Sequence, residues 1–116
     1  MSEVKLIVAD SSDIMLNGIL SYLSACPDII ICGKATTYKS LCEEVEKKNH
    51  DVILLGPMMI DRYNDFINSS FQRKFPKKTI IQIGLSDEPA DIIKKIRNHT
   101  NSSIPAKSLL KQFSNN

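Results

Sequence analysis

Four short apolar runs that do not alternate with polar residues constrain the fold of this chain more than any other feature. They are Val4 to Ala9, Asp28 to Cys32, Asp51 to Leu55 and Thr79 to Ile83, and a polar or turn-forming residue follows each one. Strands that are apolar on both faces are typical of a parallel sheet covered by helices on both sides. We therefore expect a doubly wound α/β domain in which helices connect the strands.

Apolar residues at helical spacing separate these runs, and capping residues mark where helices begin. Ser11 or Ser12 can cap a helix that ends near Ala25-Cys26-Pro27, and Thr36 or Thr37 can cap the next one. A later helix follows Ser86-Asp87-Glu88-Pro89. The predicted inward positions are Met15, Leu16, Ile19, Leu20 and Leu23; Leu41 and Val45; Tyr63, Phe66, Ile67 and Phe71; and Ile92, Ile93 and Ile96.

The remaining segments have weaker patterns. Gly56-Pro57 ends the third run, and we expect a loop after it. A short strand around Ser103-Ile104 would complete a five-stranded sheet. A last helix would follow it, with Leu109, Leu110 and Phe113 on its inner side.

The composition predicts one soluble domain. The chain has 116 residues, of which 42% are hydrophobic and 24% charged, and no apolar run approaches the roughly 20 residues of a membrane span. The first residues lack the features of a secretion signal, so we expect a cytoplasmic protein with no membrane partner. Cys26, Cys32 and Cys42 lack zinc-ligand spacing and are read as reduced thiols; a regulatory disulfide between two of them stays open.

Charge is distributed unevenly along the chain. Residues 1 to 71 carry six Lys/Arg against ten Asp/Glu, whereas residues 72 to 116 carry nine against three. Because no aromatic residues are interleaved with the C-terminal basic residues, a solvated face or a protein interface is favoured over direct nucleic-acid contact. These residues are Lys94, Lys95, Arg97, Lys107 and Lys111.

Three segments together resemble the receiver domain of two-component response regulators. They are Leu6-Ile7-Val8-Ala9-Asp10, the stretch from Cys26-Pro27-Asp28 to Gly33-Lys34-Ala35, and Asp51-Val52-Ile53-Leu54-Leu55. Pro-Asp-Ile followed by Gly-x-Ala is most similar to the NarL/FixJ-type subfamily. The resemblance implies a flavodoxin-like, CheY-like fold, with a five-stranded parallel sheet in a three-layer α/β/α sandwich. It covers nearly the whole chain, so we expect a single receiver-like domain over residues 1 to 116.

The resemblance breaks at the residues that carry the chemistry of the family. Family members have two acidic residues after the first strand, a phosphoacceptor aspartate after the third, a hydroxyl residue after the fourth and a lysine after the fifth. Here Ala9 and Asp10 stand at the acidic pair, Gly56 at the acceptor and Gly84 at the hydroxyl. The lysine position falls on Ala106 or, with a one-residue insertion, on Lys107.

Gly56 has the clearest consequence, because phosphoryl transfer needs a carboxylate oxygen as nucleophile and glycine has no side chain. Asp10 alone is a poor residual site for Mg²⁺, which prefers octahedral oxygen coordination, so we expect no catalytic residue, no metal site and no cofactor. A helix cap formed with Ser11 and Ser12 is a simpler explanation for Asp10. Gly56 and Gly84 can likewise be explained as residues that permit tight turns.

Two classes of function remain open. The first is an atypical receiver that acts without phosphorylation by dimerising or by binding another signalling protein. It would reach DNA only through a C-terminal helix-turn-helix output domain, or it would be a stand-alone adaptor. The second is a small flavodoxin-like cofactor carrier or enzyme, although no glycine-rich phosphate loop follows the first strand. A visible flavin spectrum would distinguish the two.

We expect the interaction surface between Asp87 and Phe113. The candidate residues are Ile92, Lys94, Lys95, Arg97, Lys107 and Leu110. The alternative is that the apolar members of this segment all lie in the core, because neighbouring apolar residues often occupy opposite edges of one buried helix face. If the protein is strictly monomeric and charge reversal of Lys94, Lys95 and Arg97 changes no partner interaction, the next candidate surface is formed by the first helix and the last helix, which carries Leu109, Leu110 and Phe113.

Overall fold

The sheet predicted from the apolar runs is present and parallel. The computed structural model describes residues 3–59 and 70–102, with side chains up to Asn98. Its four strands lie in the order β2-β1-β3-β4, and each neighbouring pair is parallel. The strands are β1 Val4–Ala9, β2 Ile29–Ala35, β3 Val52–Leu55 and β4 Ile80–Gln82. The fifth strand expected around Ser103-Ile104 lies outside the described residues.

The two predicted helix caps are confirmed, and each is now assigned to one residue. Helix α1, Asp13–Leu23, begins after Ser12, whose hydroxyl oxygen accepts the Met15 N–H at 3.2 Å. Helix α2, Tyr38–Lys47, begins after Thr37, whose hydroxyl accepts the Ser40 N–H at 3.0 Å. The Ser40 hydroxyl accepts the Thr37 N–H in return, so two otherwise free backbone donors are satisfied.

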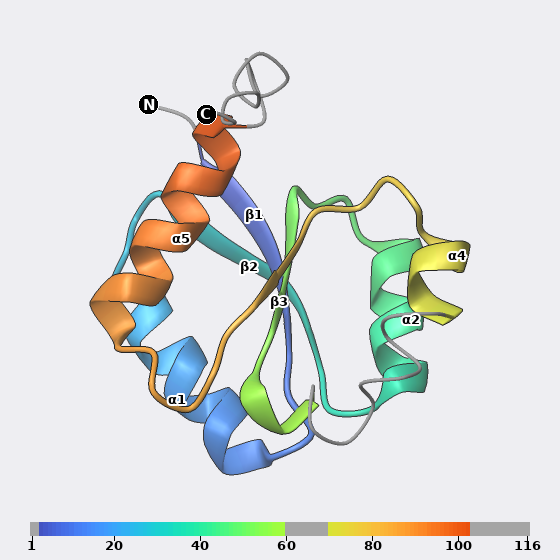
Figure 1. The fold of residues 1–116 in the computed structure, drawn as a ribbon, viewed down its shortest axis with the longest axis horizontal. Helices are drawn as coiled ribbons and strands as arrows, with labels where there is room; N and C mark the ends of the chain where they lie inside the picture. The colour runs from blue at the N-terminus through green and yellow to red at the C-terminus, as the bar shows by residue number, and fades with distance from the viewer. Residues whose placement is uncertain (1–2, 60–69, 103–116) are drawn as a thin grey trace.

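Helices cover both faces of the sheet (Figure 1). Helix α1 and helix α5, Pro89–Ser102, lie on one face, whereas α2 and the short α4, Gln72–Lys74, lie on the other. Two apolar clusters correspond to these faces. The first joins both helices of its face to the sheet through Leu16, Leu23, Ile92 and Ile96. The second includes Leu41, Val45 and Phe71.

The segment after β3 differs from the prediction. We expected a loop after Gly56-Pro57, but residues 57–59 are helical. Proline is favoured in the first turn of a helix because its φ angle is already suitable and its missing N–H would have no partner there. Phe71 is buried as predicted, while Tyr63, Phe66 and Ile67 lie outside the described residues.

Among the described residues, no helix combines the length and the apolar character that a membrane span requires.

Candidate functional site

The carboxyl ends of the parallel strands bring three of the predicted site residues to one edge of the sheet. The Asp10 N–H donates to the Ala35 carbonyl at 3.1 Å, and the Gly56 N–H donates to the Ala9 carbonyl at 2.8 Å. Gly84 follows Ile83, whose N–H donates to the Leu55 carbonyl at 3.0 Å. Asp10, Gly56 and Gly84 therefore follow neighbouring strands at the same edge, where ligands of such sheets bind.

Asp10 is the only buried charged or polar residue among those described, and each oxygen of its carboxylate accepts a backbone hydrogen bond. Its Oδ1 accepts the Ser12 N–H at 3.0 Å, and its Oδ2 accepts the Met58 N–H at 3.3 Å. Burial raises the pKa of this carboxyl, and the backbone hydrogen bonds from Ser12, Met58 and Ser11 partly counteract the increase. Asp10 thus links the backbone after β1, at Ser12, to the backbone after β3, at Met58.

Gly56 lies directly against this carboxyl group. A β-carbon added to Gly56 would clash with Asp10 Oδ2 and would lie 2.7 Å from Asp10 Cγ. The carboxyl of Asp10 therefore fills the space in which a side chain at residue 56 would begin. This relationship could not be read from the sequence, because it depends on the direction in which Asp10 points.

Ser11 adds a second link between the same two segments. Its hydroxyl donates to the Met58 carbonyl at 2.9 Å, while the Met58 N–H is bound by Asp10. Both backbone groups of Met58 are thus held by the loop that follows β1. We call Asp10, Ser11 and Met58 the edge clamp. The predicted role of Asp10 in capping α1 is confirmed only indirectly, since Ser12 is the cap and Asp10 binds the backbone of Ser12.

Gly84 belongs to a separate local network. Its N–H donates to Asp87 Oδ2 at 2.8 Å, and Lys95 Nζ donates to the same oxygen at 3.1 Å. These two partners lower the pKa of Asp87, with the Gly84 N–H contributing most. A β-carbon on Gly84 would have only one neighbouring atom within 4 Å, Asp87 Oδ2 at 4.0 Å. Unlike Gly56, Gly84 therefore has room for a side chain.

The described residues of this edge do not fit the Mg²⁺ that the receiver resemblance implies. Mg²⁺ needs several oxygen ligands in octahedral geometry. Both oxygens of Asp10 accept backbone N–H groups, the Asp87 carboxylate is engaged by the Gly84 N–H and Lys95, and Ala9 and Gly56 have no side-chain ligand. Across the part of the chain that the structure describes, no three His, Cys, Asp or Glu residues are grouped as a metal site would require.

The predicted interaction residues differ in their exposure and in their ion pairs. Ile92 is only 3% exposed and packs in the core, so its side chain supports α5 from inside and is not available to a partner. Lys95 is paired with Asp87 at 3.1 Å, and Arg97 with Asp28 at 2.8 Å. Lys94 is exposed. Lys107 and Leu110, and with them the choice between Ala106 and Lys107, lie outside the described residues.

The ion pair of Arg97 connects α5 to the start of β2. Arg97 Nε donates to Asp28 Oδ2 at 2.9 Å while Nη2 donates to Oδ1. This two-point geometry is the strongest arrangement of an arginine and a carboxylate. It lowers the pKa of Asp28 and raises that of Arg97, mainly through the hydrogen bonds between the two side chains. The predicted basic face is therefore partly neutralised by acidic residues of the same chain.

Comparisons with known proteins were made by sequence and by structure. No family model and no curated protein matches the sequence. The RcsB response regulator of Salmonella typhimurium, in a study of its DNA interaction, matches with a TM-score of 0.75 at 20% identity, over 98% of this chain and 69% of that one. The non-phosphorylated receiver domain of RcsB from Escherichia coli matches with a TM-score of 0.63 at 23% identity, over 78% and 72%.

This chain has the fold of a response-regulator receiver domain. A structure of two RcsB dimers bound to two parallel DNAs also matches, with a TM-score of 0.61 at 24% identity, over 80% of this chain and 48% of that one. This chain thus spans about two thirds or less of the RcsB chains that extend beyond the receiver. The receiver fold confirms the resemblance seen in the sequence.

Sequence reasoning missed two participants at this edge. Met58 takes part through its backbone only, so the identity of its side chain gives no signal. Asp87 was assigned to the start of α5, but its carboxylate also binds the Gly84 N–H. An acidic residue that reaches back to the N–H three positions earlier forms half of a capping box, and this spacing could have predicted the contact.

Proposed function

We propose that this chain is an atypical receiver domain that takes part in signal transduction without being phosphorylated, through binding to a protein partner or to itself. The observation that carries the proposal is the contact between Asp10 and Gly56. The acceptor position has no nucleophile, and the space in front of it holds a carboxyl group that is already bound to Ser12 and Met58. A phosphoryl group has neither an acceptor nor a place to bind.

The edge clamp orders this edge of the domain without a phosphoryl group. Asp10 and Ser11 hold Met58 by both of its backbone groups, and this contact is made within the folded chain. Such a domain stays in one arrangement unless a partner binds another arrangement more tightly. A receiver of this kind would report the presence of a partner, whereas an ordinary receiver reports its own phosphorylation.

The face formed by α1 and α5 is our proposed interaction surface. It carries the exposed Lys94, and the first turn of α1 carries Ile14, which is 83% exposed. Leu85, just before α5, is 74% exposed. Charged residues beside exposed apolar ones are typical of protein interfaces. The last helix expected from the sequence, around Leu109 to Phe113, lies outside the described residues, so the proposed surface rests on α1 and on the helix that follows Ser86-Asp87-Glu88-Pro89.

Our proposal for the process that the domain regulates rests on analogy with RcsB. RcsB has been described in complexes with DNA and as dimers, and this chain corresponds to the receiver portion of it. We propose that the domain contributes to transcription regulation in the cytoplasm, as part of a longer regulator with a DNA-binding domain or as a separate adaptor. On this proposal the domain is not an enzyme and binds no flavin.

Treatment with acetyl phosphate or phosphoramidate and Mg²⁺, followed by intact mass spectrometry, tests the proposal. The mass should not change, whereas an ordinary receiver that retains its acceptor aspartate should gain one phosphoryl group under the same conditions. A stable phosphoryl group on this chain, mapped to any aspartate, would overturn the proposal.

A further inference from the structure

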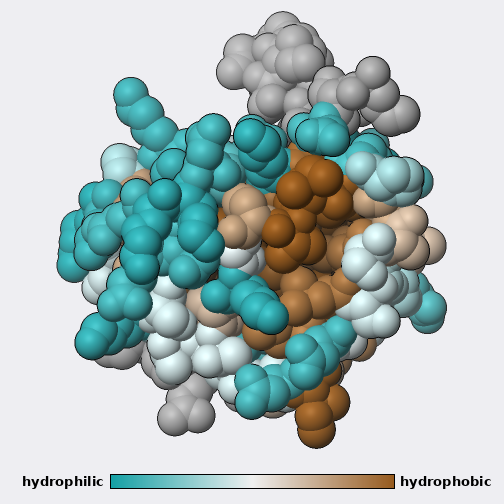
Figure 2. Space-filling view, turned by 180° about the vertical axis from the view of Figure 1, so that it is seen from behind, coloured by the Kyte–Doolittle hydropathy of each residue, from teal (hydrophilic) through white to brown (hydrophobic). Residues whose placement is uncertain are grey.

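Strand β2 forms one edge of the sheet, and a groove runs along its outer side. In the described sheet β2 has a single neighbour, β1. The groove is lined by Leu20 and Ser24 of α1, by the strand from Ile31 to Lys34, and by Glu44 and Lys48 from the α2 side. Figure 2 shows the molecule from behind, where an apolar band runs between hydrophilic regions. Free strand edges are the usual template for pairing with another extended chain.

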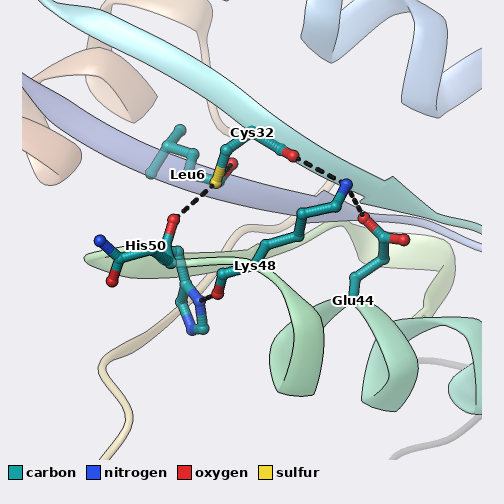
Figure 3. A network of polar contacts seen from close by, with 6 residues as sticks. Leu6, Cys32, Glu44, Lys48 and His50 are labelled. Atoms are coloured by element: carbon teal, nitrogen blue, oxygen red, sulfur yellow. Dashed lines mark hydrogen bonds and ion pairs between the residues drawn. The ribbon is translucent and has the colours of Figure 1, made fainter.

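The strand is irregular where it lies in this groove. Leu6 pairs with Ile31 and Ile7 pairs with Gly33, so Cys32 is an extra residue that forms a bulge. The Cys32 thiol donates toward the Leu6 and Asn49 carbonyls, at 3.2 and 3.3 Å. The Cys32 carbonyl instead accepts a hydrogen bond from Lys48 Nζ at 3.2 Å (Figure 3). A side chain thus covers a backbone acceptor that another strand could have used.

Glu44 completes this cover. Its Oε1 binds Lys48 Nζ at 2.9 Å, and it lies 2.5 Å from the position that a β-carbon on Gly33 would occupy. Glycine at residue 33 therefore leaves the space in which the Glu44 carboxylate rests against the strand. Lys48 remains 42% exposed, and ion pairs in such positions contribute little to stability. The cover can be displaced at small cost by a ligand that replaces its contacts.

The charges of the groove indicate what would displace it. Lys34, Lys48 and one acidic residue, Glu44, line the groove, so the lining carries a surplus positive charge. Lys34 is exposed and forms no ion pair within the ranges that the structure describes. The apolar surface between these charges comes from Leu20 and Ile31. The lining therefore matches an extended segment that combines apolar side chains with a carboxylate.

We propose that the β2 edge is a docking groove for an extended, acidic and apolar segment of a partner protein. The segment adds to β2 as a further strand, and its backbone replaces Lys48 at the Cys32 carbonyl. Its acidic side chains pair with Lys34 on one side of the strand and with the released Lys48 on the other. A second copy of this chain is a poorer occupant, because a concave groove flanked by two helices cannot fill an identical groove. The proposal does not depend on the phosphorylation state of the domain.

Selection from a displayed library of random heptapeptides tests the chemistry of the occupant. We expect the bound peptides to be enriched in Asp or Glu beside Val, Ile or Leu, relative to the unselected library. A synthetic peptide of the enriched sequence should then shift the amide resonances of Ile31 to Lys34. Absence of acidic enrichment, or shifts confined to another surface, would overturn the proposal.

Three single variants separate the groove from general charge effects. Lys34→Glu should weaken binding of that synthetic peptide about tenfold, whereas Lys39→Glu, an equal charge change on an exposed residue outside the groove, should leave it unchanged. Glu44→Gln should strengthen binding several-fold, because it removes the carboxylate that competes for Lys48. Equal effects of Lys34→Glu and Lys39→Glu would contradict the proposal. So would groove resonances that shift with protein concentration alone, since that result identifies a second copy as the occupant.

Discussion

The carboxyl group of Asp10 occupies the space in which a side chain at residue 56 would begin, and a β-carbon on Gly56 would clash with Asp10 Oδ2. The two residues are therefore coupled: Asp10 can lie in its present position only because residue 56 is glycine. On the proposed function, this contact also leaves no acceptor side chain at residue 56.

Replacing Gly56 by alanine should destabilise the domain by about 1–3 kcal/mol, because the new methyl group forces Asp10 away from Ser12 and Met58. Gly18→Ala is the matched control. Gly18 lies inside α1 and its added β-carbon would meet no atom within 4 Å, so the substitution should stabilise by about 0.5–1 kcal/mol. Urea denaturation measures both changes. Similar free energies of unfolding for the two variants would contradict the contact.

Restoring the acceptor alone should not restore phosphorylation. In Gly56→Asp the new carboxylate meets the buried carboxylate of Asp10, and like charges at close range disfavour each other. The triple variant Ala9→Asp, Gly56→Asp and Gly84→Thr should be labelled better by acetyl phosphate, because acceptor, metal ligands and hydroxyl act as a unit. Gly84→Thr alone should fold normally and stay unlabelled, since residue 84 has room for a side chain. Equal labelling of the single and triple variants, measured by intact mass, would argue against this reasoning.

The raised pKa of Asp10 predicts how stability changes with pH. A group whose pKa is higher in the folded state contributes stability that is present below the pKa of the unfolded state and is lost as pH rises through the folded value. Asp10→Asn removes this titration. The free energy of unfolding of the wild type should therefore fall relative to that of Asp10→Asn as the pH is raised from 3 to 7. Parallel stability curves for the two proteins would show that Asp10 titrates normally.

Charge reversal on α5 should have different effects at neighbouring positions. Arg97→Glu should destabilise the domain, because it places a carboxylate against Asp28. Lys94→Glu makes the same reversal from positive to negative charge at an exposed residue. It should leave the thermal midpoint almost unchanged. The lowered pKa of Asp28 means that the pair stabilises above the ordinary aspartate pKa and loses this effect as pH falls through the lowered value. Thermal melts at neutral and acidic pH, in low and high salt, measure each effect.

A test of the interaction surface on α5 must therefore separate binding from folding. A combined reversal of Lys94, Lys95 and Arg97 would break two ion pairs within the chain. Lys94→Glu alone is the cleaner variant for self-association or partner binding, which sedimentation would measure. A strictly monomeric wild type at high concentration, with no change in partner binding in the variant, would place the interface elsewhere.

The sequence by itself determined the order of the elements and the absence of a side chain at residue 56. Apolar runs without alternation predict a parallel sheet because both faces of each strand are buried, and β1, β2, β3 and β4 were each located within three residues of their observed ends. The caps at Ser12 and Thr37 were recognisable because capping is a contact between near neighbours. Glycine at residue 56 excludes an acceptor whatever surrounds it.

The tertiary structure decided everything that depends on contacts between distant segments. The position of Asp10 against Gly56, the binding of Met58 by Asp10 and Ser11, and the pairing of Arg97 with Asp28 join residues more than 40 positions apart. The packing of α5 beside α1 and the bulge at Cys32 also depend on neighbours that no local pattern specifies. The physical reason is that periodicity and capping report only the nearest turns of the chain. The direction of a side chain and its partner are set by packing between elements.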